Sequence, residues 1–146
     1  MTELLSLAAV LACTLFAGAA IYINLVEHPA RLSCGTEIAA TEWKPSYERA
    51  TWMQAPLAIV AAFAGAGLWA QGFGPLWLWG ATLIFSVVPF TLVVIRPTNE
   101  RLSQRDRDRQ SAETRHLLER WGRLHAVRSG LSLTASIFYV RALSGP

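Results

Sequence analysis

The length and composition of the chain indicate a single membrane-embedded domain. The chain has 146 residues, which is enough for one domain. Its hydrophobic fraction is 53%, and these residues are collected into long runs, as membrane spans are. The net charge of +3 is small, and the basic residues alternate with acidic ones, which argues against a nucleic-acid-binding protein.

Four apolar runs predict four membrane-spanning helices. The first covers about residues 4–26 and has no basic residue before it, so we expect an uncleaved span and not a signal peptide. The second and third cover about 50–70 and 76–95, separated by a turn rich in glycine and proline; Pro89 predicts a kink in the third. The fourth, about 124–140, is at the lower length limit for a span. We therefore expect an all-α, four-transmembrane-helix bundle formed by residues 1–146 as one domain.

Basic residues predict how the bundle is oriented. Of the 13 Lys and Arg residues, all but Arg141 lie between the first and second spans, between the third and fourth, or just inside the fourth. By the positive-inside rule both connections are cytoplasmic and both termini lie outside. Residues 100–119 alternate in charge and lack Gly and Pro, which predicts a solvated helix. A lid over the site and a docking surface for a cytoplasmic partner are the alternatives.

Polar side chains gather where the first span ends. Asn24, Glu27, His28 and Arg31 are spaced i, i+3, i+4 and i+7, so they share one face if the helix persists. Ionisable groups at membrane depth are costly and usually functional. We therefore interpret Glu27 and His28 as metal ligands or as an acid–base pair. An ion pair between Glu27 and Arg31 in a polar helix end is the alternative.

The other three spans add polar residues at the same end of the bundle. These residues are Tyr47 and Gln54 in the second, Asn99 after the third, and Trp121, His125 and Arg128 in the fourth. Trp121, His125 and Arg128 are spaced i, i+4 and i+7, which places them on one helix face. Tyr47 and Gln54 can bind substrate by hydrogen bonds or simply anchor the helix. Asn99 is either a helix-end residue or a carbonyl ligand.

Two histidines and a carboxylate suggest a metal site. His28, His125 and Glu27 form the ligand set that suits non-haem Fe(II), with copper or zinc as alternatives. Adjacent residues on a helix diverge by ~100°, so Glu27 and His28 need not reach one ion, and Asn99 would then be the third ligand. Histidines at one depth on two helices also fit haem. In a metal-free form, His28 or His125 is a general base on a phenolic substrate and Arg128 holds the anion.

The order of these motifs resembles a known family. The motifs are Glu27-His28-Pro29, Gln54-Ala55-Pro56, Pro97-Thr98-Asn99 with Leu102, and Trp121-Gly122-Arg123-Leu124-His125 with Arg128. Over about residues 15–140 they resemble the anthrone oxygenase-like family of small integral membrane proteins. The resemblance implies a four-helix membrane protein. It also implies O₂-dependent oxidation of an anthrone to an anthraquinone.

The leading hypothesis is a membrane-embedded oxidoreductase whose aromatic or quinone-like substrate enters from the bilayer. Its catalytic residues would be His28, His125 and Glu27, and its substrate-binding residues Tyr47, Gln54, Trp121 and Arg128. One rival is a non-enzymatic membrane protein that binds a metal, haem or quinone. The other is an accessory subunit of a membrane complex. The sequence does not define the substrate, the metal, the electron source or the oligomeric state, and a homo-oligomer is compatible with it.

Overall fold

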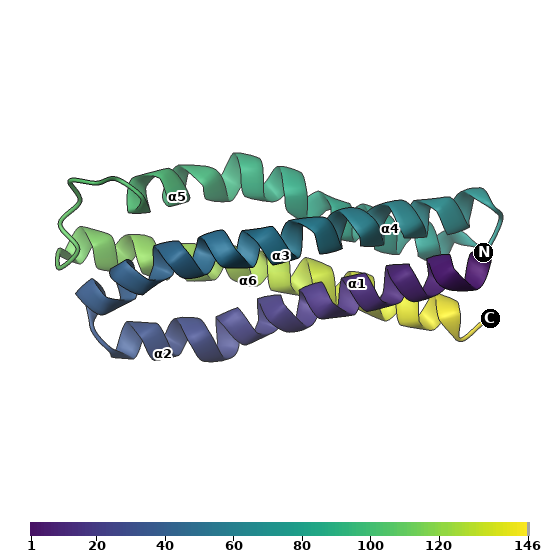
Figure 1. Cartoon of the computed structure of the whole chain (residues 1–146), viewed down its shortest axis with the longest axis horizontal. Helices are drawn as coiled ribbons and strands as arrows, with labels where there is room; N and C mark the ends of the chain where they lie inside the picture. The colour runs from purple at the N-terminus through teal and green to yellow at the C-terminus, as the bar shows by residue number, and fades with distance from the viewer. Residues whose placement is uncertain (146) are drawn as a thin grey trace.

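The computed structural model describes residues 1–145 and shows four long helical segments lying side by side (Figure 1). The segments are α1 (Thr2–Tyr22), η1 (Ile23–Glu27) and α2 (His28–Ser33); α3 (Thr36–Ala70); α4 (Pro75–Phe90), η2 (Thr91–Ile95) and α5 (Arg96–Leu102); and α6 (Ala112–Leu143). Both η elements are single π-helical turns inside segments that are otherwise α-helical. The four segments are called the first to fourth rods in chain order. Within residues 1–145 there is no β-strand, which confirms the all-α prediction.

Short turns make neighbouring segments antiparallel. α1 packs against α3 and α6, and α4 also packs against α3 and α6. Gly35 and Gly74 take positive φ values of 95° and 98° directly before α3 and α4, a backbone conformation that favours glycine. The two termini lie at one end of the molecule, and the α2–α3 and α5–α6 connections lie at the other (Figure 1).

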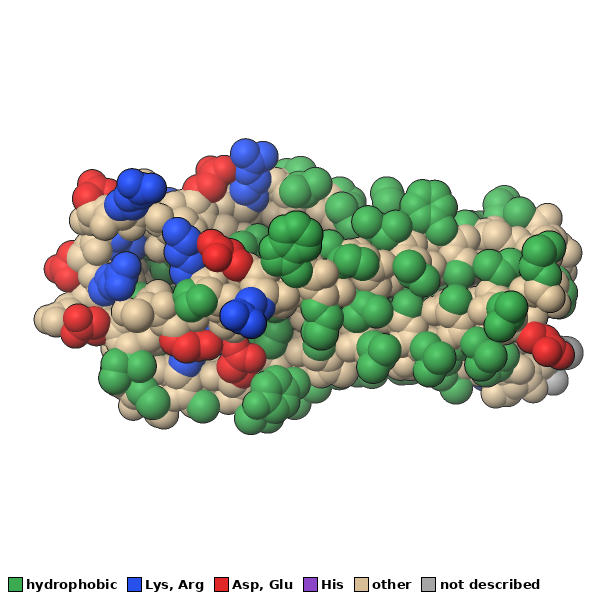
Figure 2. Space-filling view, in the orientation of Figure 1, with side chains coloured by type: hydrophobic (Ala, Val, Ile, Leu, Met, Phe, Trp, Pro, Cys, Tyr) green, Lys and Arg blue, Asp and Glu red, His purple; other side chains and the backbone are tan. Residues whose placement is uncertain are grey.

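The surface divides into a charged end and an apolar band. Three segments, Thr2–Ser33, Thr36–Ala70 and Pro75–Leu102, are long and apolar enough to cross a membrane. Figure 2 shows most of the Lys, Arg, Asp and Glu side chains gathered around the α2–α3 and α5–α6 connections, with hydrophobic side chains over most of the remaining length and Glu3 at the opposite end. An apolar surface of this extent indicates a lipid environment. α6 is not among the three segments, because serines and charged residues interrupt its apolar residues.

The core of the apolar half is built around one tyrosine. Tyr139 of α6 is fully buried, and its hydroxyl donates a 2.7 Å hydrogen bond to the carbonyl oxygen of Ala61 in α3. Its ring packs against Trp77, with 5.4 Å between ring centroids. Gly65 and Gly80 leave the space for this ring, since a β-carbon at either position would overlap it. Two glycines on neighbouring helices therefore allow α6 to insert a large side chain between them.

The charged segment between the third and fourth rods differs from the helix predicted for residues 100–119. The helix ends at Leu102, residues 103–111 form a loop, and α6 begins at Ala112. The antiparallel return of α6 beside α5 requires this break. Ser111 marks it, because its hydroxyl accepts a hydrogen bond from the backbone N–H of Thr114 and so caps α6.

Ion pairs hold this loop in place. Arg101 at the end of α5 and Arg107 in the loop both pair with Glu113 in the first turn of α6. The hydrogen bond from Arg101 and the nearby charge of Arg107 lower the pKa of the Glu113 carboxyl. Gln110 also donates a 2.8 Å hydrogen bond to Glu37 at the start of α3. The loop is thus bound to α6 through Arg107 and to α3 through Gln110.

Substitution at Gly65 tests the packing of Tyr139. We expect Gly65→Val to destabilise the folded protein by about 1–3 kcal/mol, because the new side chain displaces the buried tyrosine ring. The matched control is Gly67→Val on the same helix, where a β-carbon meets no atom within 4 Å. Thermal unfolding in detergent measures both. Equal midpoints for the two variants would contradict this packing argument.

Candidate active site

Aromatic rings from three helical elements meet at the charged end of the molecule. Trp121 of α6 contacts the rings of His28 and His125, with centroid distances of 5.1 and 4.8 Å. The edge of Trp121 also meets Trp43 of α3 at 5.9 Å, and Trp43 stacks on Tyr47 at 5.3 Å. Trp43, Trp121, His28 and His125 are all buried. Four of the predicted site residues are therefore brought into one continuous group, with Trp43 as an additional member.

A hydrogen-bond network orients His125. Its Nδ1 lies 2.7 Å from Oδ1 of Asn24, which also accepts a 2.6 Å hydrogen bond from the hydroxyl of Ser129. The Asn24 amide nitrogen donates to the carbonyl oxygen of Gly122 at 2.9 Å, which fixes which end of the amide faces His125. Because Oδ1 can only accept, Nδ1 carries the imidazole proton. Nε2 is therefore the nitrogen with a free lone pair, as a general base requires.

His28 is held by one hydrogen bond to α6 and by close packing against Gly122. Its Nε2 donates a 3.0 Å hydrogen bond to the carbonyl oxygen of Leu118 on α6. Its Nδ1 is buried and has no hydrogen-bond partner. Gly122 makes room for the ring, since a β-carbon there would lie 2.6 Å from two of its atoms. The His28 ring therefore packs against Trp121 and Gly122 where the first and fourth rods are in contact.

A second polar group lies in a cavity between α3 and α4. Arg128 of α6 donates a 2.9 Å hydrogen bond from Nη2 to Oε1 of Gln54, and its guanidinium lies 5.5 Å from the ring centre of Phe16. The cavity has a volume of about 170 Å³. Its lining residues are Phe16, Tyr47, Thr51, Gln54, Ala55, Ala58, Val87, Val88, Thr91, Leu92 and Arg128. Tyr47, Gln54 and Arg128 are brought together here as a set, whereas neither histidine lines the cavity.

Two buried donors at this cavity have no partner. Nε of Arg128 and Nε2 of Gln54 make no hydrogen bond within residues 1–145, although Gln54 is 2% exposed and Arg128 is 9% exposed. Leaving buried donors unsatisfied costs free energy, so such groups usually meet a ligand or water. Two N–H donors beside an apolar wall are suited to bind an oxygen atom of an otherwise hydrophobic molecule.

Asn99 also has an unsatisfied polar atom. It is buried on α5, and its Oδ1 has no hydrogen-bond partner. Ile95 and Leu102, four residues before and three after it, belong to the hydrophobic cluster that contains Trp43 and Trp121. Asn99 therefore lies on the side of the third rod that packs toward the aromatic group.

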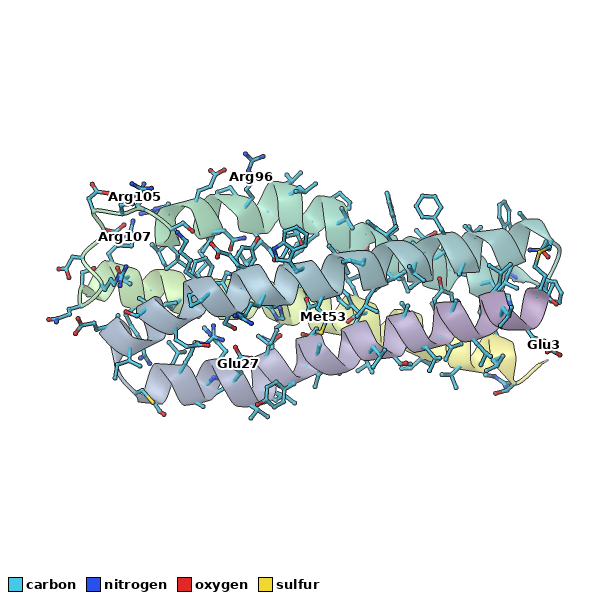
Figure 3. The ribbon with its side chains drawn as sticks, in the orientation of Figure 1. Glu3, Glu27, Met53, Arg96, Arg105 and Arg107 are labelled. Atoms are coloured by element: carbon cyan, nitrogen blue, oxygen red, sulfur yellow. The ribbon has the colours of Figure 1, made fainter. Side chains whose placement is uncertain are left out.

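Glu27 faces a different neighbour from His28. Its carboxylate accepts hydrogen bonds from Arg31 and from Ser46 of α3, and Arg31 also pairs with Glu42 of α3 at 2.6 Å. Figure 3 shows Glu27 where the first rod faces α3. The helix persists through Pro29, but the face predicted for residues 24–31 is divided between α3 and α6. Within residues 1–145, no group of three or more His, Cys, Asp or Glu side chains is placed to hold a metal ion.

Two parts of the site were not predicted as site residues. Trp43 is completely buried beside Trp121. Its spacing of four residues from Tyr47 was the available signal, because i, i+4 aromatic residues share a helix face. Asn24 was placed on the polar face, but its role in orienting His125 depends on the contact between the first and fourth rods, which local spacing does not reveal.

Comparisons with known proteins agree with the family resemblance. The family model described as anthrone oxygenase matches residues 43–138. The anthrone oxygenase tpcL of Aspergillus fumigatus is 41% identical over 66 residues, which cover 43% of this chain and 41% of that protein. The alignment thus spans less than half of the relative's length. No solved structure matches significantly. Because the family model covers most of the chain, including both aromatic and polar parts of the site on α3 and α6, this protein belongs to the anthrone oxygenase family.

Proposed function

We propose that this protein is a four-span membrane oxidoreductase that uses O₂ to oxidise a hydrophobic anthrone-type substrate held by Arg128, Gln54 and Tyr47. The observation that carries the proposal is the pair of unsatisfied buried donors on Arg128 and Gln54, two residues that line an apolar cavity. Membership of the anthrone oxygenase family supports the reaction class. The activity named for the A. fumigatus relative supports the substrate class.

The burial pattern of α6 supports a fourth span. Four polar or charged residues of this helix, Arg128, Ser129, Ser132 and Ser136, are buried against the other helices. After His125, most of its exposed residues are apolar and include Val127, Leu133, Ile137 and Val140, although Thr134 and Arg141 are also exposed. The average hydropathy of such a helix underestimates its ability to span a membrane, because lipid contacts only its outward face. Arg and Lys clustering at the opposite end from the termini supports a cytoplasmic location for both connections.

Substrate would enter the cavity from the bilayer. The cavity lies between α3 and α4–η2, and its rim includes the exposed residues Ala55 and Leu92. Its volume of about 170 Å³ is below the roughly 300–1,000 Å³ of pockets that enclose a drug-sized ligand. We propose that it takes the oxygen-bearing edge of a flat aromatic molecule, whose remaining rings lie along the lipid-facing cleft.

The chemistry begins with loss of a proton from the methylene carbon of the anthrone. The negative charge moves onto the ketone oxygen, where the Arg128 guanidinium and the Gln54 amide would stabilise it by hydrogen bonds. His125, one helical turn from Arg128, has a free Nε2 lone pair for this proton, and because it does not line the cavity the transfer would pass through a bridging water. The electron-rich anion is then oxidised by O₂. One oxygen atom becomes the new ketone of the anthraquinone, and the other leaves as water with the two methylene hydrogens.

The arrangement of donors favours the metal-free form of this proposal. A site made of His28, His125 and Glu27 would require Glu27 to leave both Arg31 and Ser46 and turn from α3 toward α6. The hydrogen bond from Nδ1 of His125 to Asn24 does not distinguish the two forms, since it leaves the Nε2 lone pair for a proton or for a metal. His28 and Asn99 keep unsatisfied atoms and serve in this proposal as neighbours of the base. Binding of iron, copper, zinc or haem by the two histidines is the alternative that metal analysis decides.

Replacing Arg128 tests the proposed binding of the substrate oxygen. We expect Arg128→Met to lower kcat/KM for an anthrone by about 10²–10³-fold, because the charge on the ketone oxygen loses its main stabilising group. Arg96→Met is the control, since Arg96 is exposed and forms an ion pair with the exposed Glu100. Oxygen uptake and anthraquinone absorbance measure both variants. Full activity of Arg128→Met would contradict the assignment.

Replacing each histidine separates the base from a metal ligand. We expect His125→Ala to lower kcat by about 10²–10⁴-fold through loss of the general base, with no metal released. Elemental analysis and the visible spectrum of the purified wild-type protein and of His125→Ala and His28→Ala provide the readout. Stoichiometric iron, copper or zinc, or a haem Soret band, that disappears in both variants would support the metal-binding alternative. Full activity in both variants would eliminate either role for the histidines.

A further inference from the structure

The spacing of buried residues along the first rod changes at η1. From Ala9 to Ile23 consecutive buried positions are one or three residues apart, as expected for one face of an α-helix. The next buried residue is His28, five positions after Ile23, followed by Arg31. The π turn accommodates this longer step, because the N–H of His28 donates to the carbonyl oxygen of Ile23 instead of Asn24. Without it, the inward position four residues after Ile23 would be Glu27.

A proline follows this π turn, and the same sequence of elements occurs in the third rod. η1 ends at Glu27 and is followed by His28 and Pro29, and η2 ends at Ile95 and is followed by Arg96 and Pro97. The N–H of Arg96 likewise donates five residues back, to Thr91. Proline has no N–H and its ring crowds the carbonyl oxygen four residues earlier, so an α-helical turn before it is unfavourable. Both π turns pack against α6, the helix that carries Trp121 and His125.

We infer that Pro29 is a positioning residue that selects His28 over Glu27 for the interior of the site, through the π turn that precedes it. The contact of the His28 ring with Gly122 and its hydrogen bond to Leu118 favour the same register. Proline alone does not produce a π turn, since Pro45 and Pro56 lie within the continuous α-helix α3. The inference that this register matters for catalysis rests on the proposed function; the structural part does not.

The first test determines the helix register from thiol labelling and does not depend on enzyme activity. In a Cys34→Ser background, which removes the exposed free thiol, Glu27→Cys and His28→Cys are labelled in membranes with a water-soluble maleimide. With Pro29 present we expect fast labelling at position 27 and slow labelling at position 28. Pro29→Ala should reverse the two rates, because an uninterrupted α-helix turns the later residues by about 100°. Pro45→Ala, the matched control, should leave both rates unchanged. Unchanged rates in Pro29→Ala would overturn the inference.

The second test restores the register by deletion. The π turn contains one residue more than the α-helical path, and Val26 lies on it with its side chain 50% exposed. Deleting Val26 in Pro29→Ala should return the labelling pattern to that of the parent protein, whereas deleting Val26 alone should not. For anthrone oxidation, Pro29→Ala should lose about a hundredfold in rate and the combined variant should recover it. A destabilised protein would not be rescued by removing a further residue, so failure of rescue would also overturn the inference.

If the wild-type protein does not oxidise an anthrone, the labelling rates still decide whether Pro29 sets the register. Reversed labelling without any oxidation would therefore count against the proposed function alone. Unreversed labelling with active wild-type enzyme would count against the role of Pro29 alone.

Discussion

The hydrogen bond between Asn24 and His125 joins the first helical segment to the last, and the rest of the site depends on it. In an apolar interior an unsatisfied amide or imidazole is costly, so each polar group must find its partner on another helix. Asn24 satisfies this requirement three times, through His125, Ser129 and the Gly122 carbonyl. The same contact brings Gly122 against His28 and sets Trp121 between the two histidines. The hydrogen bond from His28 to the carbonyl oxygen of Leu118 also joins these two segments, but the Asn24 amide is the group that orients His125.

The two polar groups of the site differ in how completely the protein satisfies them. In the first, hydrogen bonds join Asn24, His125 and Ser129 and so define the orientation of His125, while Nδ1 of His28 and Nε1 of Trp121 beside it have no partner within residues 1–145. The second, at Arg128 and Gln54, shares only one hydrogen bond and retains free donors. Defined hydrogen bonds suit a group that must keep one tautomer, whereas free donors suit a group that must bind something else. The division matches the roles of base and substrate anchor that we propose.

Much of the fold and part of the site could be predicted from the sequence. Long apolar runs gave the first three rods, and i, i+4 spacing placed Trp121, His125 and Arg128 on one face of α6. The orientation of Glu27 could not be predicted, because it depends on a π turn that shifts the helix face by one residue. The loop at 103–111 was also missed, because its sequence lacks Gly and Pro and the break is imposed by the antiparallel return of α6. Burial of Trp43 depends on Trp121, which lies on a distant segment of the chain.

The position of the opening of the Arg128–Gln54 cavity, between α3 and α4, also determines from which phase the protein would take up its substrate. Its rim residues, Ala55 and Leu92, are exposed on the apolar surface and not at the charged end. A molecule that reaches the cavity through this opening is drawn from the lipid phase, where a hydrophobic compound is far more concentrated than in water. The occupancy of the cavity would then depend on the number of substrate molecules per lipid molecule. Adding lipid at constant total substrate would dilute the substrate as effectively as adding buffer does for a soluble enzyme.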